Sequence, residues 1–154
     1  MHADLWSFTL DLYAKPGIEA ACLSLQASGG NVCLLLCGVW LMRRDVACNA
    51  QRALEIGQLA RPWHDDVVRP LRELRTHWRN AAQHDPVLGS FRERVKALEL
   101  AAERELLMRL ESQTQGWSTT VTRGQEDWLT LLAGEAADNN RDALHVLRVA
   151  ANQA

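Results

Sequence analysis

The sequence predicts an all-α protein, a single-domain bundle of about seven or eight helices. Apolar residues recur at three- and four-residue spacing, whereas the strict apolar/polar alternation of a half-buried strand is absent at useful length. Only 4 Pro and 9 Gly interrupt the 154 residues. A chain of this length, with 47% hydrophobic and 23% charged residues, buries one core without metal or disulfide support. We therefore expect residues 1–154 to form one helical domain.

The first two helices are bounded by a capping residue and by helix breakers. Asp4 is a suitable N-cap for a helix to about Ala14, because its carboxylate accepts hydrogen bonds from free backbone N–H groups. Pro16 ends that helix, since proline disfavours the α conformation in the preceding residue. The second helix continues to about Ala27 and stops at the Ser-Gly-Gly sequence of residues 28–30, where glycine supplies the left-handed C-terminal conformation.

The third helix, residues 32–44, is predicted to be the buried centre of the bundle. Asn31 caps it, and its side chains are apolar on every side until Arg43 and Arg44. The two arginines suit the negative end of the helix dipole. The apolar run from Val32 to Met42 is much shorter than the about 20 residues that a membrane-spanning helix needs.

Two prolines divide the middle of the chain. Asp45 is expected to cap a fourth helix over residues 46–60. Pro62 then fits the first turn of a fifth helix over residues 62–83, and Pro70 marks a second helix start or a kink.

The remainder of the chain contains a long helix and two shorter ones. Asp85 followed by Pro86 is a cap with a proline in the first turn, which predicts a helix to about Thr114 that Gly116 ends. Within this helix, apolar residues recur at three- and four-residue spacing: Leu88, Phe91, Val95, Leu98, Ala102 and Leu106. A loop over residues 117–124 leads to helices near 125–136 and from 139 or 140 to about 151.

Three segments near the start of the chain resemble a known family. They read D-L-W-x-F-x-L-x-L-Y from Asp4, P-G-I-E-A-A-C-L-x-L-Q from Pro16 and N-V-x-L-L-L-C-x-x-W-L from Asn31. This run resembles a small proteobacterial family classed as a domain of unknown function, with a looser likeness over Trp63–Trp78. The resemblance implies a small, soluble, helical bacterial protein. It implies no catalytic residue, because the family has no established activity.

The overall charge and the N-terminus bear on partners and location. A formal net charge of -2 and a pI near 6.2 argue against a protein that coats nucleic acid or an anionic membrane by bulk charge. The N-terminus has no basic segment followed by an apolar stretch and a small-residue cleavage site. We expect a cytoplasmic protein that binds no membrane and needs no cofactor.

One flank of the expected fifth helix is basic. Arg72, Arg75 and Arg79 fall on the same side, next to an apolar stripe that runs along the helix. They are candidate residues for binding an anion or a partner, because guanidinium groups bind phosphate and carboxylate bidentately. The alternative is an ordinary solvated face, balanced by Asp65, Glu73 and neighbouring helices.

Six tryptophans beside one Tyr and two Phe are an unusual feature of the composition. Trp117 follows Gly116 in a Ser/Thr-rich loop, which makes it a candidate interface anchor. The other five lie among aliphatic residues at helical spacing, so we expect them in the core or in the wall of a groove. Trp6, Tyr13 and Trp40 are the candidate lining of an apolar pocket.

The sequence contains no catalytic and no metal-binding signature. Cys33 and Cys37 lie four apart in the most apolar helix, and no C-x-x-C pair exists, so the cysteines are expected to be buried thiols without a disulfide. The paired Glu-x-x-His motifs of a di-iron bundle are absent. His64 precedes Asp65 and Asp66, but side-chain neighbours in a helix lie three or four residues apart, which disfavours a catalytic dyad.

These observations favour a non-enzymatic cytosolic interaction or regulatory protein that binds another protein, since Trp and Arg are enriched at binding hot spots. A nucleic-acid or ribosome accessory factor that uses the arginine flank is an alternative, and its affinity would fall steeply with salt. A further alternative is a carrier of an apolar ligand, or an enzyme, with a cavity lined by Trp and Tyr. The sequence itself identifies neither the partner nor the oligomeric state.

Overall fold

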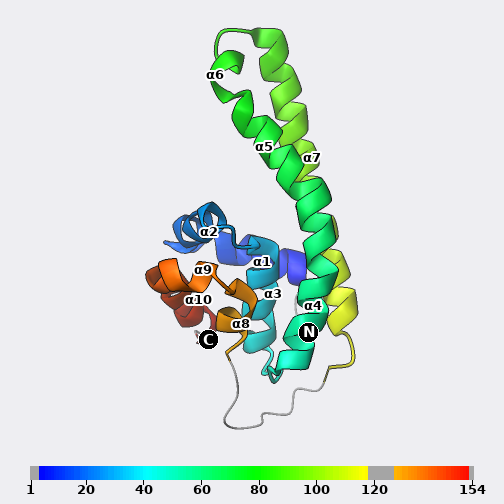
Figure 1. Ribbon diagram of the computed structural model, residues 1–154, viewed down its shortest axis with the longest axis vertical. Helices are drawn as coiled ribbons and strands as arrows, with labels where there is room; N and C mark the ends of the chain where they lie inside the picture. The colour runs from blue at the N-terminus through cyan, green and yellow to red at the C-terminus, as the bar shows by residue number, and fades with distance from the viewer. Residues whose placement is uncertain (1–3, 118–126, 153–154) are drawn as a thin grey trace.

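The computed structural model describes residues 4–117 and 127–152, and these residues form helices and connecting turns without a strand. The prediction of an all-α protein is therefore confirmed. The helices are arranged as a compact body from which one long helical hairpin projects (Figure 1). We call this hairpin the arm and define it as residues 69–98.

The body is built around α3 (Val32–Arg43), which confirms the predicted buried central helix. Nine of its twelve residues are buried, from Cys33 to Leu41. The helices that pack against it are α1 (Leu5–Tyr13), α2 (Ile18–Ala27), α4 (Ala50–Trp63), α7 (Pro86–Thr114), α8 (Trp128–Ala133) and α10 (Arg141–Asn152). The approach of α8 is so close that a Cβ atom on Gly38 would lie 2.8 Å from Leu132 Cδ1. A side chain at this position would therefore force Leu132 to shift.

Three of the helix caps predicted from the sequence are confirmed. The Asp4 carboxylate accepts from the Ser7 N–H at 2.7 Å, and the Asn31 side chain accepts from the Leu34 N–H at 3.2 Å. Asp85 accepts from the first-turn N–H groups of α7 (Pro86–Thr114), whose bounds match the prediction. Each of these side chains satisfies backbone donors that the helix itself leaves unpaired.

The predicted fourth helix is wrong at its start. Asp45 has a φ of 56°, a left-handed conformation, and its N–H donates to the Met42 carbonyl as part of the turn that closes α3. The helix α4 (Ala50–Trp63) begins later, where the Asn49 side chain accepts from the Arg52 N–H at 2.8 Å. The buried Val46 and Cys48 lie in the intervening segment.

The predicted break before Pro62 is also wrong, because the chain stays helical through both prolines. Pro62 lies inside α4, and a π-helical turn, η1 (His64–Val68), joins α4 to α5 (Arg69–His77). A proline ring clashes with the carbonyl four residues earlier in a regular α-helix. The wider π-turn, in which the Arg69 N–H donates to the His64 carbonyl, lies directly before Pro70 and relieves that clash.

The short α6 (Arg79–Ala82) ends this run, and α7 then returns from the tip of the arm to the body. After α7, the predicted loop at 117–124 and the predicted start of a helix near 125 fall almost wholly outside the described residues. The helix expected to reach 136 is instead divided into α8 and α9 (Ala136–Asn139), with Gly134 between them at a φ of 55°. The last helix, α10, begins close to its predicted start.

Among the described helices, none combines the length and the apolar content that crossing a bilayer requires.

The buried centre of α3 predicts a large difference between two leucine substitutions. Leu35 is 1% exposed, whereas Leu10 on α1 is 52% exposed. Leu35→Ala should lower the free energy of unfolding by about 2–5 kcal/mol, because it removes buried methyl groups and leaves a cavity. Leu10→Ala is the matched control and should change it by less than about 1 kcal/mol. Urea denaturation measures both, and similar losses in the two variants would contradict the buried position of α3.

Candidate functional site

Charged side chains join the two helices of the arm at its base. The Glu99 carboxylate on α7 accepts hydrogen bonds from Arg75 Nε at 2.5 Å and from Arg72 Nε at 3.1 Å. Arg72 Nη2 also donates to Glu103 at 3.3 Å. On the same side, Arg92 Nε donates to the Arg75 carbonyl at 2.9 Å. The Glu99 side chain is only 7% exposed, so the ion pairs form away from bulk water.

Burial and the arginines act in opposite directions on these carboxyl groups. Burial raises the pKa of Glu99, but the hydrogen bonds and charges of Arg75 and Arg72 outweigh it and hold that pKa below its usual range. For Glu103, burial is the larger effect and raises the pKa. The Glu99 carboxylate therefore remains charged and fixes both guanidinium groups on α5.

The structure thus separates the three arginines that the sequence groups together. Arg72 and Arg75 turn toward carboxylates of α7, and Arg79 is exposed on α6. The other expected partners, Asp65 and Glu73, lie near Arg69 instead, at 3.6 and 3.8 Å. This arrangement favours the interpretation of a charge-balanced face over that of an anion-binding strip, because two of the three guanidinium groups are already neutralised.

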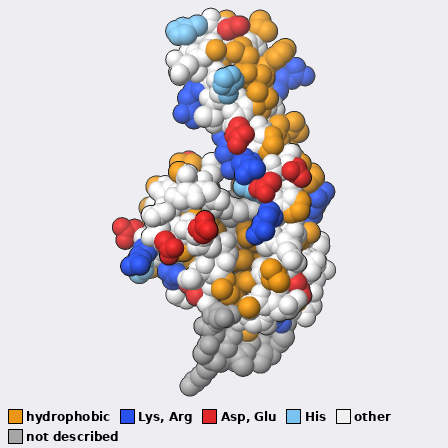
Figure 2. Space-filling model, in the orientation of Figure 1, with side chains coloured by type: hydrophobic (Ala, Val, Ile, Leu, Met, Phe, Trp, Pro, Cys, Tyr) orange, Lys and Arg blue, Asp and Glu red, His pale blue; other side chains and the backbone are white. Residues whose placement is uncertain are grey.

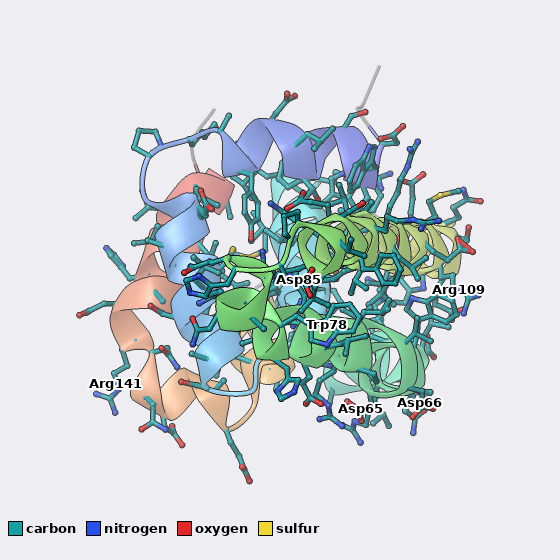
Figure 3. The ribbon with its side chains drawn as sticks, turned by 90° about the horizontal axis from the view of Figure 1, so that it is seen from above. Asp65, Asp66, Trp78, Asp85, Arg109 and Arg141 are labelled. Atoms are coloured by element: carbon teal, nitrogen blue, oxygen red, sulfur yellow. The ribbon has the colours of Figure 1, made fainter. Side chains whose placement is uncertain are left out.

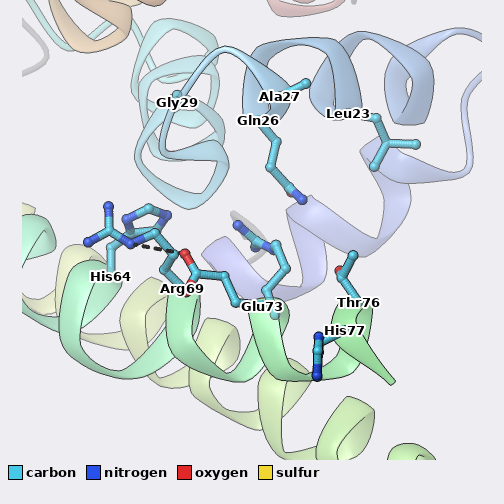
Figure 4. Close-up of a pocket in the computed structure, with 11 residues that line it drawn as sticks. Leu23, Gln26, Ala27, Gly29, His64, Arg69, Glu73, Thr76 and His77 are labelled. Carbon is cyan, nitrogen blue, oxygen red and sulfur yellow. Dashed lines mark ion pairs between the residues drawn. The ribbon is translucent and has the colours of Figure 1, made fainter. Parts of the chain in front are cut away.

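A cleft of about 500 Å³ lies between the body and the base of the arm (Figure 4). The end of α2 and the turn at Gly29 and Gly30 form one wall, and η1 with α5 forms the other. Gly29 has a φ of 89°, and a Cβ on Gly30 would lie 2.8 Å from the Leu25 carbonyl oxygen, so the turn requires both glycines. The side chains that supply polar groups are Gln26, His64, Arg69, Arg72, Glu73, Thr76 and His77.

His64 is a partly buried polar residue of this cleft. Its Nδ1 lies 3.3 Å from Asp65 Oδ1, so the two neighbouring side chains do meet, contrary to the expectation for a regular helix. Both residues belong to the π-turn, whose geometry differs from that on which the expectation rested. The Nε2 atom is buried and has no hydrogen-bond partner. Burial lowers the pKa of His64, so the ring is neutral at pH 7.

The candidate interface anchor Trp117 packs onto its own protein. Its ring stacks on Trp128 with centroids 6.0 Å apart, and the Arg52 guanidinium lies 5.1 Å from its centroid. Trp128 is buried and donates its indole N–H to the Val46 carbonyl at 2.9 Å. Trp117 itself is half-buried, so part of its surface remains open to a partner.

The three candidate pocket residues also have contacts within the protein. Trp40 is buried with the Arg44 guanidinium 4.3 Å from its ring centroid, and Arg104 lies 5.2 Å from the centroid of the half-buried Trp6. Tyr13 is half-buried, and burial raises the pKa of its hydroxyl. The cleft at the base of the arm is lined by none of the three, so a pocket formed by them stays a prediction.

The four cysteines are free and buried, as predicted for core thiols: Cys22, Cys33, Cys37 and Cys48. Burial raises the pKa of Cys22 to about 11 and that of Cys37 to about 12, which makes both thiols unreactive at neutral pH. Within the described residues, no group of three or more His, Cys, Asp and Glu side chains is placed to hold a metal ion.

The arm presents apolar side chains to solvent. No residue of the arm is buried. Leu74, Val87, Phe91 and Leu98 are 37%, 67%, 50% and 56% exposed, respectively. Hydrophobic side chains gather along one side of the arm up to its tip (Figure 2). Viewed from above, Trp78 and Asp85 mark the tip region, while Arg141 lies on α10 at the other side of the molecule (Figure 3).

Sequence reasoning missed both the arm and the cleft. The signal for the arm was present in α7, where the predicted apolar stripe includes Phe91 and Leu98 in a helix too long for the body to cover. The signal for the cleft was the pair of prolines that flank the π-turn, of which Pro62 was interpreted as a helix start and Pro70 as a second start or a kink. Nothing in the sequence pattern placed α2 opposite α5.

Comparison with known proteins identifies one family. The model of a family described as "Protein of unknown function (DUF2390)" matches residues 4–110, which is more than half of the chain and includes the whole arm. This confirms the resemblance to an uncharacterised family. No curated protein matches the chain, and no solved structure matches it.

The charge cluster predicts unequal effects of substituting two neighbouring arginines. Arg75→Gln removes a guanidinium from the nearly buried Glu99 and should lower the free energy of unfolding by about 2–3 kcal/mol. Arg79→Gln, the matched control on an exposed residue, should change it by less than about 0.5 kcal/mol. Chemical denaturation near neutral pH measures both values. Equal, small effects would mean that the cluster does not hold the arm together.

His64 predicts a pH dependence of stability with a defined sign. Its pKa is lowered in the folded protein, so below the unfolded value of about 6.5 the unfolded chain binds more protons. The free energy of unfolding should therefore fall as the pH drops below about 6.5, and His64→Gln should show a smaller fall. Urea midpoints measured from about pH 8 to pH 5 test this, since the difference between the two curves isolates His64 from the other histidines. Parallel curves would refute it.

Proposed function

The chain belongs to a protein family of unknown function, and we propose that it is a non-enzymatic interaction protein that binds another protein chain through the arm. The observation that carries this proposal is the composition of the arm surface. Over residues 69–98 no side chain is buried, yet large apolar side chains are more than one third exposed. A contiguous exposed apolar surface of this kind is typical of protein-binding sites.

The energetics of an isolated helical hairpin support the proposal. Helices in proteins are stabilised mainly by the burial of an apolar face, and the two helices of the arm cover each other only partly. Removing the remaining exposed area of Phe91 or Leu98 from water would contribute roughly 1 kcal/mol of binding free energy for each side chain. A partner helix that packs on the arm supplies this burial.

The alternative of a nucleic-acid factor is less well supported by the geometry. Arg72 and Arg75, which would contact phosphate, are bound to Glu99 and Glu103. Phosphate binding would have to displace these carboxylates, which remain on the adjacent helix and repel an anion.

A second candidate function is binding of a small polar molecule in the cleft at the base of the arm. The specific observation in its favour is His64 Nε2, which is buried without a hydrogen-bond partner beside a cleft of about 500 Å³. In the neutral ring, the Asp65 carboxylate favours a proton on Nδ1, which leaves Nε2 as an acceptor for a hydroxyl or amide donor. Imidazole NMR shifts of His64 during titration with such compounds report this binding.

Site-specific cross-linking tests the proposed role of the arm. A photoreactive amino acid at position 91 on the arm, in cells that express the protein, should form a stoichiometric adduct with one protein chain. The same amino acid at position 10 on α1, where Leu10 is 52% exposed against 50% for Phe91, should form none. The two positions match in exposure and differ in location, so the comparison isolates the arm.

Substitutions test whether the adduct depends on the apolar surface of the arm. With the cross-linker at the exposed position 90 of the arm, the double substitution Phe91→Ser and Leu98→Ser should abolish the adduct, because it removes the apolar contact area. The body double substitution Leu10→Ser and Leu23→Ser, at two residues that are 52% and 53% exposed, should leave it intact. Equal adducts at positions 91 and 10, or an adduct that survives the arm substitutions, would contradict the proposal.

A further inference from the structure

A second, outward-facing pattern runs along α7. Seven residues follow one another at alternating four- and three-residue spacing: Val87, Phe91, Arg94, Leu98, Ala101, Glu105 and Met108. We call these residues the outer stripe. All are exposed except Glu105, whose side chain is 43% exposed. Alternating steps of three and four residues are the heptad pattern of a coiled-coil seam.

The outer stripe is distinct from the face of α7 that packs in the protein. The buried residues of α7 are Glu99, Ala102, Leu106, Leu107, Leu110 and Thr114. None of these belongs to the outer stripe. Within residues 4–117 and 127–152, no neighbouring helix buries the outer stripe, beside the body or on the arm.

We propose that the outer stripe binds the same stripe of a second copy of this chain, with the two α7 helices antiparallel. The proposal rests on the proposed function, that the arm binds a protein chain, and it identifies that chain. Antiparallel coiled coils place each a residue against a d residue of the other helix. With a two-fold axis between Glu99 and Leu100, six of the seven residues of the outer stripe face another stripe residue of the second copy, and Val87 faces Ser112 at the end of the contact.

The complementarity concerns charge and size. In this register Arg94 of one copy faces Glu105 of the other, and the two-fold axis repeats this ion pair. Phe91 faces Met108, a pairing of an aromatic ring with a thioether, which is favourable. Leu98 faces Ala101, so a large side chain meets a small one in both central layers. The pattern is thus self-complementary, as an isologous interface requires.

The parallel arrangement is disfavoured by the same residues. It would place Arg94 against Arg94 and Glu105 against Glu105, and like charges in facing positions are destabilising. A single charged pair within an apolar seam is a known means of fixing register and orientation. Glu105 lies 3.5 Å from Arg109 in the structure, but this exposed pair within one helix is worth little and does not prevent the new contact.

The proposed contact extends over most of α7. In this register α7 overlaps its copy from residue 87 to residue 112, which at about 1.5 Å per residue is about 39 Å of paired helix. The four large apolar residues of the stripe are 67%, 50%, 56% and 54% exposed (Val87, Phe91, Leu98 and Met108). Because α7 is already a continuous helix of 29 residues, the pairing of two copies does not require the helix to form.

Sedimentation equilibrium of the full chain tests the dimer. The wild-type protein should sediment as a dimer at a concentration of about 100 μM. Arg94→Glu places two Glu–Glu contacts in the dimer and should weaken association at least about tenfold, as should Glu105→Arg. The double variant Arg94→Glu, Glu105→Arg restores opposite charges and should recover most of the affinity. Arg141→Glu, an exposed residue on α10, makes the same charge change as Arg94→Glu and should have no effect.

Engineered cysteines test the orientation. A mixture of Leu98→Cys and Ala101→Cys chains should form a disulfide between the two different chains faster than either chain forms one with itself, because residue 98 faces residue 101 only in the antiparallel register. The four native cysteines are buried and do not compete. Faster self-linking of the Leu98→Cys chain would overturn the antiparallel arrangement. Circular dichroism of each variant verifies that the fold is retained.

The outcomes for the dimer and for the proposed function are distinguishable. A monomeric wild type that still forms an arm-specific adduct with another protein overturns the dimer and leaves the proposed function in place. A monomeric wild type without an arm-specific adduct overturns both. A dimer that is insensitive to Arg94→Glu and Glu105→Arg overturns the assignment to the outer stripe.

Discussion

The geometry of the arm depends on one carboxylate, Glu99. No residue between Arg69 and Leu98 is buried, so the arm has no hydrophobic core of its own to fix the spacing of its helices. Glu99 is the first buried residue of α7 after the tip, and it binds two guanidinium groups of α5 at once. A carboxylate removed from water needs these partners, since an unpaired buried charge costs several kcal/mol. The position of α5 against α7 follows from that requirement.

The parts of the fold that local chemistry determines were predictable, and those that depend on distant contacts were not. Asp4, Asn31 and Asp85 mark helix starts because a cap needs only its own chain neighbours. Pro62 was misinterpreted as a helix start because proline is tolerated inside a helix when the lost hydrogen bond is accommodated locally. The pairing of Arg75 with Glu99 joins residues 24 positions apart, and spacing within one helix does not reveal it.

Within α7 as well, the sequence pattern does not reveal which residues contact a neighbouring helix. The apolar spacing in α7 predicts an amphipathic helix, but it does not distinguish a residue that meets α5 from one that faces solvent. Leu88 and Val95 are half-buried, whereas Phe91 and Leu98, in the same predicted stripe, are at least half exposed. The stripe is wider than the surface that one neighbouring helix covers. The remaining width is available to a second neighbour, which the chain does not supply in its own described residues.

In the proposed dimer, folding and association are controlled by different faces of the same helix. The inward face of α7 carries Glu99 and the buried leucines, and the outer stripe carries residues whose side chains are largely exposed. Exposed side chains contribute little to the free energy of unfolding. A charged pair such as Arg94 and Glu105 adds little affinity at a solvated surface, but it penalises every register that brings like charges together. In the proposed dimer, the charges of the outer stripe determine which helix binds and in which direction, while Phe91, Leu98 and Met108 supply the burial that makes the contact stable.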